Sequence, residues 1–165
     1  MTGPWVASVL AVVMVLLQKQ PITLDGIGPL RVGLSVAAAS RAAGEALIEA
    51  EDQPSESDAC HHVRLRSVRS VLFMVENDRI VRVETADPRF RTASGVHVGD
   101  SESKVRGIYG SRLEVSQHTY NEDGHYFTVR SSDGGRALVM ETDGKHVVYI
   151  RAGLVPAAEY VEGCL

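Results

Sequence analysis

The sequence predicts an α+β fold in which two similar modules, each a short helix followed by an antiparallel meander, share one curved antiparallel sheet with both helices on one face. The first observation is an internal repeat: residues 28–86 can be laid over residues 94–152, which places Gly33 on Gly99. The others are two capped helices and two sets of hairpins at matching places. Two copies are too few for a solenoid, so we expect one compact domain.

The repeat also sets the module boundaries. We place the first module at residues 24–88 and the second at residues 89–165, with a separate N-terminal segment at residues 1–23. The linker between the modules is at residues 87–95. The second copy is one residue longer within the turn at residues 143–145. Loops accept such insertions, whereas a slip within a strand would turn its buried face outward.

Each module begins with a helix that a serine and a glycine delimit. Ser35 and Ser101 can each accept a hydrogen bond from a backbone N–H in the first turn, as N-cap residues do. Gly44 and Gly110 follow at the positions where a left-handed residue ends a helix. Between the caps, apolar residues at i, i+3 and i+4 predict one buried stripe on each helix. These residues are Ala39, Ala42 and Ala43 in the first module and Val105, Ile108 and Tyr109 in the second.

About three strands follow each helix, because short β-prone segments alternate with turn residues. Asn77-Asp78 and Asp143-Gly144 fit hairpin turns, and Gly134-Gly135 is a further turn. An acidic loop at residues 49–58 interrupts the first module and is expected to be its least rigid part. The expected strands are residues 63–68, 71–75 and 80–83 in the first module and 126–131, 137–141 and 147–150 in the second.

The composition excludes some classes of partner. Of 165 residues, 44% are hydrophobic and 23% are charged, as in globular domains. The net charge of −4 offers no attractive field for nucleic acid, and aromatic residues at 5% are too sparse for a base-stacking surface. We therefore expect a protein partner, no nucleic acid, and no contact with a membrane except through the N-terminal segment.

That N-terminal segment predicts export. The apolar stretch at residues 5–17 is shorter than the roughly 20 residues that cross a bilayer as a helix, and it has the length of the apolar region of a signal peptide. No Lys or Arg precedes it, and Gln18-Lys19-Gln20 occupies the place of a small-residue cleavage site. We expect a periplasmic, envelope or secreted protein. The alternatives are an uncleaved anchor and a buried N-terminal strand or helix in a cytosolic fold.

The two cysteines fit the same compartment. Cys60 and Cys164 form an even pair without a Cys-x-x-Cys motif, which argues against zinc or redox chemistry. A disulfide between them would fix the C-terminal tail to the first module. Closing a loop of about 100 residues contributes about 4–5 kcal/mol in the chain-entropy model. The alternative is two unpaired buried thiols.

A family resemblance follows from the residues that open the two helices. Val32-Gly33-Leu34-Ser35 and Val98-Gly99-Asp100-Ser101 resemble the tandem helix-plus-sheet repeat of β-lactamase inhibitory protein. They are also similar to the small outer-membrane lipoproteins of the barrel-assembly machinery, which hold one such module. The resemblance covers roughly residues 24–165 and implies an exported α+β domain that binds a protein. The cysteines lie elsewhere and the inhibitory loops cannot be matched, so it implies the fold and not the target.

We predict no catalytic, cofactor or metal site. His61 and His62 are adjacent, so on a strand they point to opposite faces. His118 and His125 flank a turn, and no Gly-x-Ser-x-Gly motif occurs. The stretch at residues 26–29 lacks the third glycine of a dinucleotide-binding loop and fits a chain-entry turn. The alternative is a small metal-dependent binder or enzyme that uses these histidines.

A protein-binding face is expected on the sheet of the second module. Tyrosine, histidine and arginine side chains supply contact area at low entropic cost. The alternative is that the tyrosines only close the rim of the core. We predict a monomeric, exported, non-catalytic protein-binding domain, with an inhibitor-like module as its finer form. The alternative is a membrane-anchored structural module of the cell envelope. The face comprises Tyr120, His125, Tyr126, Arg130, Tyr149 and Arg151.

Overall fold

A computed structural model describes residues 17–53, 55 and 59–164. Residues 1–16 of the predicted N-terminal segment (residues 1–23) therefore lie outside the described residues, whereas residues 17–23 belong to the described chain. Within the described part of the chain, no helix is long and apolar enough to cross a bilayer.

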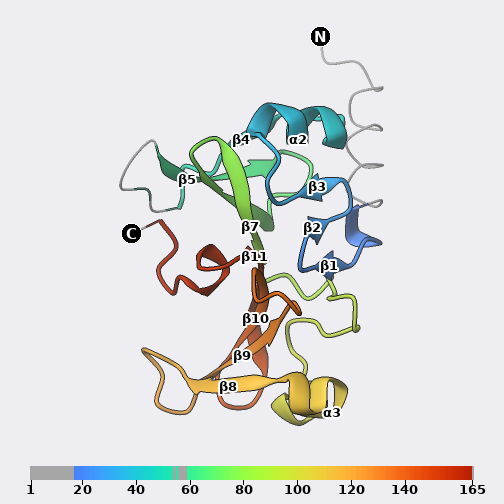
Figure 1. Ribbon diagram of the computed structural model, residues 1–165. Coiled ribbons are helices and arrows are strands. Elements are labelled where there is room, and N and C mark those ends of the chain that lie inside the picture. The colour runs from blue at the N-terminus through green and yellow to red at the C-terminus, as the bar shows by residue number, and fades with distance from the viewer. Residues whose placement is uncertain (1–16, 54, 56–58, 165) are drawn as a thin grey trace.

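Among the described residues, the main sheet has eight antiparallel strands in the order β4-β5-β6-β7-β11-β10-β9-β8 (Figure 1). The first half of the chain supplies β4 to β7 and the second half supplies β8 to β11, so the halves meet where β7 pairs with β11. The predicted α+β class with one curved antiparallel sheet is confirmed. The strands are β4 (Leu47–Glu49), β5 (Cys60–Leu65), β6 (Val71–Glu76), β7 (Arg79–Thr85), β8 (Glu114–Gln117), β9 (His125–Arg130), β10 (Arg136–Thr142) and β11 (Val147–Leu154).

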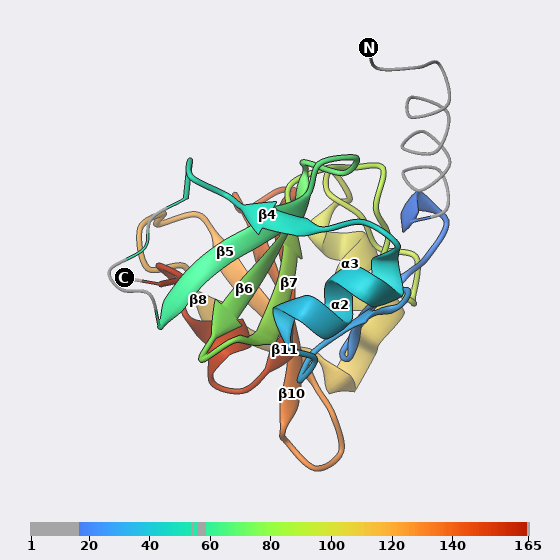
Figure 2. The ribbon, with the colours of Figure 1, turned by 90° about the horizontal axis from the view of Figure 1, so that it is seen from above.

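Both predicted helices are present and lie on the same face of this sheet (Figure 2). In α2 (Val36–Ala43), the Ser35 hydroxyl accepts a hydrogen bond from the N–H of Ala38 at 3.2 Å. In α3 (Glu102–Tyr109), Ser101 caps the first turn in the same way. Gly44 ends α2 with a φ of 70°. A short 3-10 turn, η1 (Gly110–Arg112), follows α3.

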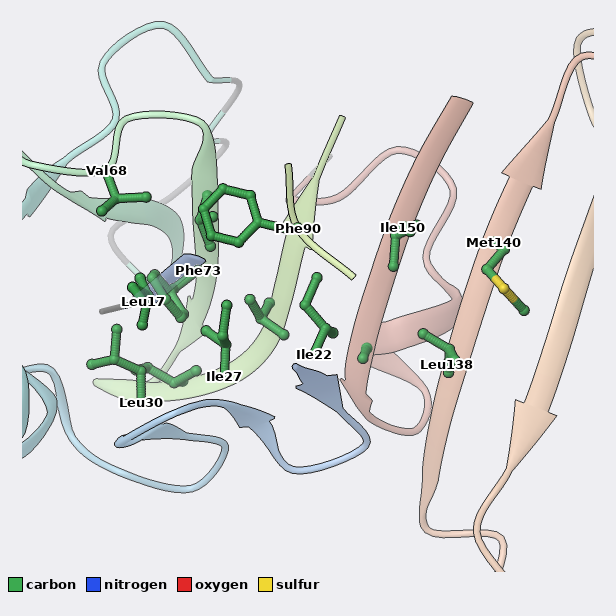
Figure 3. Packing of buried hydrophobic residues seen from close by; sticks show 14 of the residues in the cluster. Leu17, Ile22, Ile27, Leu30, Val68, Phe73, Phe90, Leu138, Met140 and Ile150 are labelled. Carbon is green, nitrogen blue, oxygen red and sulfur yellow. The ribbon is translucent and has the colours of Figure 1, made fainter. Parts of the chain in front are cut away.

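The core lies between these helices and the sheet, and a small N-terminal sheet extends it (Figure 3). That sheet consists of β1 (Ile22–Thr23), β2 (Gly26–Ile27) and β3 (Leu30–Arg31). Leu17 and Ile22 are 5% and 1% exposed, so the packed part of the chain reaches back at least to Leu17. Burying such side chains contributes about 1.5–3 kcal/mol each.

Three features differ from the expectation. Strands β4 and β8 were not predicted, because both are short and all four side chains of β8 are exposed, which leaves no apolar alternation to detect. The strand expected at 63–68 begins and ends earlier, at Cys60–Leu65. Part of the expected turn at 26–29 is β2.

The predicted linker at 87–95 is a packed loop. Phe90 is fully buried and Thr92 is 2% exposed. Ile22 N–H donates to the carbonyl of Arg91 at 2.8 Å, which ties the loop to the N-terminal sheet. The acidic loop expected at 49–58 lies partly outside the described residues.

Strand β11 approaches the backbone of β7 closely at Gly153. A Cβ at Gly153 would overlap the carbonyl oxygen of Val81, and backbone atoms cannot move aside cheaply. We expect Gly153→Ala to lower the free energy of unfolding by about 2 kcal/mol or more. Gly107→Ala is the control, because a Cβ there meets open space within α3 and should be neutral or stabilising by up to about 1 kcal/mol. Urea unfolding measures the free energy of unfolding of both variants. Equal changes in the two variants would contradict the close approach of β11 to β7.

Candidate functional site

Charged and aromatic side chains gather on the sheet face opposite α2 and α3, which we call the polar face. Alternate residues of a strand point to opposite faces. Arg82 and Glu84 of β7 therefore lie on the polar face while Val83 between them packs in the core. The pairing of β7 with β11 places Arg151 opposite Glu84. The next pairing places Tyr149 of β11 opposite Glu141 of β10.

The C-terminal segment, residues 155–164, crosses part of the polar face. It includes the 3-10 turn η2 (Ala157–Glu159) and lies on the side of the sheet away from the helices (Figure 2). Its end is fixed by the Cys60–Cys164 disulfide, with 5.4 Å between the Cα atoms, which confirms the predicted bridge. The first module and the C-terminus are thereby joined directly.

Two arginines hold the middle of this segment. Arg82 Nη1 donates to the carbonyl of Ala157 at 2.9 Å and to that of Tyr160 at 3.0 Å. Arg151 Nε donates to the carbonyl of Ala158 at 3.1 Å. Hydrogen bonds from a charged donor are among the stronger ones, so these contacts order the segment on the sheet.

Beneath the segment lies a buried cluster of charges. Arg82 Nη2 is 2.6 Å from Glu84 Oε2, and both side chains are almost fully buried. His62 Nε2 is 3.0 Å from Glu84 Oε1, but within the described chain the ring nitrogens of His62 make no hydrogen bond of good geometry, so this contact is electrostatic. Removing one member of a buried pair leaves an uncompensated charge and costs several kcal/mol.

A second pair extends the cluster toward β9. Arg151 Nη1 donates to Glu141 Oε2 at 3.2 Å, and His118 Nε2 lies 2.7 Å from Glu141 Oε1. The guanidinium of Arg151 also lies over the ring of Tyr126, 5.4 Å from its centroid. Charges and rings therefore form one continuous layer across the middle of the polar face.

The surroundings shift the pKa values of three of these groups. Burial raises the pKa of Glu84, but the contact with His62 and the charge of Arg82 lower it by more, so its net pKa is below the usual value. Burial, with the charge of Glu84, raises the pKa of Tyr149. Burial, with the charge of Arg82, lowers the pKa of the Arg151 guanidinium. At neutral pH, Glu84 is a carboxylate and Tyr149 a neutral phenol.

Among the described residues, the polar face carries a tail hollow and an edge hollow. The tail hollow, of about 400 Å³, lies beside the C-terminal segment, with His62, Arg82, Glu84 and Arg151 among its lining residues. The edge hollow, of about 360 Å³, lies beside β8 and includes Ser116, Thr128 and Arg130.

Exposed apolar side chains surround the tail hollow. Val148 and Val161 line it, and the hydroxyl of Tyr120 contacts Glu162, another lining residue. Tyr160 precedes Val161 in the C-terminal segment. These are four of the five large hydrophobic side chains that are exposed in the described chain. Apolar surface gathered around buried charges is typical of a recognition site.

The structure brings most of the predicted binding residues to this face. Tyr126, Arg130, Tyr149 and Arg151 line its two hollows, and Tyr120 lies in the loop beside it. Tyr126 is only 7% exposed and stacks on His118, so it packs in the floor of the face.

His125 does not belong to the polar face. Its Nδ1 lies 2.7 Å from Glu102 Oε1 of α3, and its ring stacks on Phe127 of the core side. The physical reason is strand alternation, which turns His125 and its neighbour Tyr126 to opposite faces.

The predicted histidine regions are separated in the same way. His61 lies 3.5 Å from Glu49, His62 contacts Glu84, and His118 contacts Glu141. Within residues 17–53, 55 and 59–164, no group of three or more metal-ligating side chains is positioned to hold an ion.

The binding residues predicted from the sequence do not include the floor of the face, which consists of His62, Arg82, Glu84 and Glu141. One pattern could have revealed it, because Arg82 and Glu84 alternate with Val81 and Val83 in a strand that is otherwise apolar. Charges at alternate positions indicate that one face of a strand is polar.

Comparisons with known proteins support the fold. No protein-family model and no curated protein sequence matches the chain. It is similar to the crystal structure of the uncharacterized protein YfeY from Escherichia coli, with a TM-score of 0.53 and 10% identity over 81% of this chain and 99% of that one. An extracellular protein containing an SCP domain from Bacillus anthracis str. Ames matches with a TM-score of 0.41 and 12% identity, over 62% of this chain and 38% of that one. The first likeness indicates a shared fold, and the second is too distant to do so.

The disulfide should supply a large part of the stability. We expect the double variant Cys60→Ala, Cys164→Ala to unfold with a free energy lower by about 4–5 kcal/mol, because the bridge restricts a long loop in the unfolded chain. Wild-type protein under reducing conditions is the control and should match the variant. Urea unfolding that is unchanged in the double variant would contradict this role.

Glu84 should also carry a pH-dependent part of the stability. Because its pKa is lowered by folding, it stabilises the protein above its ordinary value of 4.5, and this contribution is lost as the pH falls below that value. We expect Glu84→Gln to lower the free energy of unfolding by about 3 kcal/mol or more near neutral pH. The further loss of stability in acid should be smaller in this variant than in the wild type.

The exposed carboxylate of Glu114 supplies the matched control. Glu114→Gln removes a solvated ion pair and should lower the free energy of unfolding by at most about 1 kcal/mol. Urea unfolding between about pH 3 and pH 7 measures both variants. If the free energy of unfolding of Glu84→Gln falls with decreasing pH as steeply as that of the wild type, Glu84 is not the group responsible.

Proposed function

We propose that this protein is an exported, non-catalytic domain that binds a protein partner through its polar face. The observation that carries the proposal is the tail hollow, where Val148 and Val161 lie beside a floor of buried charges and Tyr120 contacts Glu162 at the rim. Aromatic and arginine side chains supply much of the binding energy at protein interfaces, and a surrounding apolar ring keeps water from them.

Export is supported by the disulfide, which persists in oxidising compartments. The apolar N-terminal stretch of the sequence is the second support. The resemblance of the two helix-opening motifs to β-lactamase inhibitory protein makes inhibition of an extracellular or envelope enzyme the finer form of the proposal. A monomer is the expected state of the free protein.

The compartment is tested by intact mass. The full chain is expressed with its native start, and the recovered protein is weighed before and after reduction. We expect a shortened chain whose mass rises by two hydrogens on reduction, because export removes a signal peptide that ends before the packed residues and allows the bridge to form. A full-length, fully reduced chain would contradict export.

Binding is tested by capture from the compartment in which the protein is found. We expect Val148→Asp to weaken capture by tenfold or more, because it places a charge in the apolar ring of the tail hollow. Ser103→Asp is the matched control, because it adds the same charge on exposed α3, on the other face. Equal capture by both variants would contradict recognition through the polar face.

The metal-dependent alternative makes a different prediction. If histidines bound a metal, zinc or nickel would raise the melting temperature, since a ligand that binds only the native state stabilises it. We expect unchanged melting, and a rise abolished by His62→Ala or His118→Ala would favour the alternative.

A further inference from the structure

The two outer edges of the main sheet differ in how they are protected. At β4, the outward-facing N–H of Leu47 already donates to the hydroxyl of Ser40 in α2 at 3.0 Å. Strand β8, at the other edge, has all four side chains exposed. Proteins usually block an edge strand with a helix, a charge or a bulge, because its unpaired groups can pair with another chain.

The pairing of β8 with β9 shows which groups are free. His118 N–H donates to the carbonyl of Gly124, and in antiparallel pairs the hydrogen-bonded positions alternate. Ser116 therefore bonds to Tyr126 of β9, while Val115 and Gln117 direct their backbone N–H and C=O groups away from the sheet. Within the described chain, no element pairs with β8 on that side.

The surface beside this edge favours a cation. Arg130 is shared between two carboxylates, Glu114 at 3.1 Å and Glu159. Arg151, also in the edge hollow, is already paired with Glu141. One negative charge is thus left uncompensated, and the Glu114 side chain is 62% exposed at the edge.

We propose that β8 is a docking edge for an extended segment of a protein partner, which adds a ninth strand and places a Lys or Arg side chain against Glu114 and the edge hollow. On the opposite side of the added strand, an apolar side chain would cover Val115, which is 42% exposed. Main-chain hydrogen bonds supply affinity in such strand addition, and alternate side chains supply specificity. The proposal rests on the proposed function in that the partner is a protein, but it uses the β8 edge and the edge hollow instead of the tail hollow.

A second copy of the chain fits this edge less well. If Val115 of one copy paired with Gln117 of another, Ser116 would lie on the two-fold axis and His118 would face Glu114. His118 already contacts Glu141 and its side chain is only 10% exposed, so the second copy brings no free cation. Charge complementarity therefore favours a basic segment of another protein.

The probe is the peptide acetyl-Thr-Val-Lys-Val-Thr-amide, titrated into the ¹⁵N-labelled, disulfide-bonded protein and followed by ¹H–¹⁵N NMR. We expect the largest shifts at the amides of Val115 and Gln117. Replacing the peptide lysine by glutamate should weaken binding by about tenfold, because it places two carboxylates together. The Glu114→Gln protein should lose most of this discrimination.

Two variants at one position separate main-chain from side-chain recognition. Val115→Pro removes an outward N–H, and proline is tolerated on edge strands, so the fold should persist in the NMR spectrum while binding falls by about tenfold or more. Val115→Thr keeps that N–H and should bind normally.

Three results would overturn the proposal. These are wild-type affinity in a folded Val115→Pro protein, shifts confined to residues away from β8, and concentration-dependent shifts at Val115 and Gln117 without peptide, which would indicate self-pairing. None of them bears on the Val148→Asp capture experiment, so this failure is distinguishable from failure of the polar-face function.

Discussion

The pairing of β7 with β11 is the constraint on which the rest of the structure depends. Among the described strands of the main sheet, it is the one pairing that joins the two halves of the chain. Its register sets Arg151 opposite Glu84 and Gly153 opposite Arg82. The glycine allows the strands to approach, and the charges from both halves then lie together on one face. A slip of one residue would move this charge layer into the core, where unpaired charges are strongly unfavourable.

The C-terminal segment depends on that charge layer and completes it. Arg82 and Arg151 each serve two roles, because they neutralise Glu84 and Glu141 and also bind backbone carbonyls of residues 157–160. The disulfide fixes the end of the segment to β5, which begins at Cys60. The segment covers only part of the face, so apolar side chains remain exposed around the tail hollow. Stability and the proposed recognition site thus share the same residues.

Local chemistry made much of the fold predictable. The structure confirms the predicted helix caps, which are Ser35 and Ser101 at the N-termini and Gly44 and Gly110 at the C-termini. The disulfide followed from the count and spacing of the cysteines. Strand β8 could not be found, because an exposed edge strand has no apolar alternation. His125 was assigned to the wrong face for lack of a strand register, although its adjacency to Tyr126 already required that only one of them face the partner. The Glu84 cluster depends on contacts between distant strands, which no local pattern specifies.

Recognition through the polar face is tested by site-specific photo-crosslinking in the compartment that holds the protein. A photoreactive residue at position 148, beside the tail hollow, is compared with one at position 103 on α3. We expect a discrete crosslinked protein from position 148 and none from position 103. Crosslinks from position 103 alone would show that the helical face binds the partner, and would contradict the assignment of recognition to the polar face.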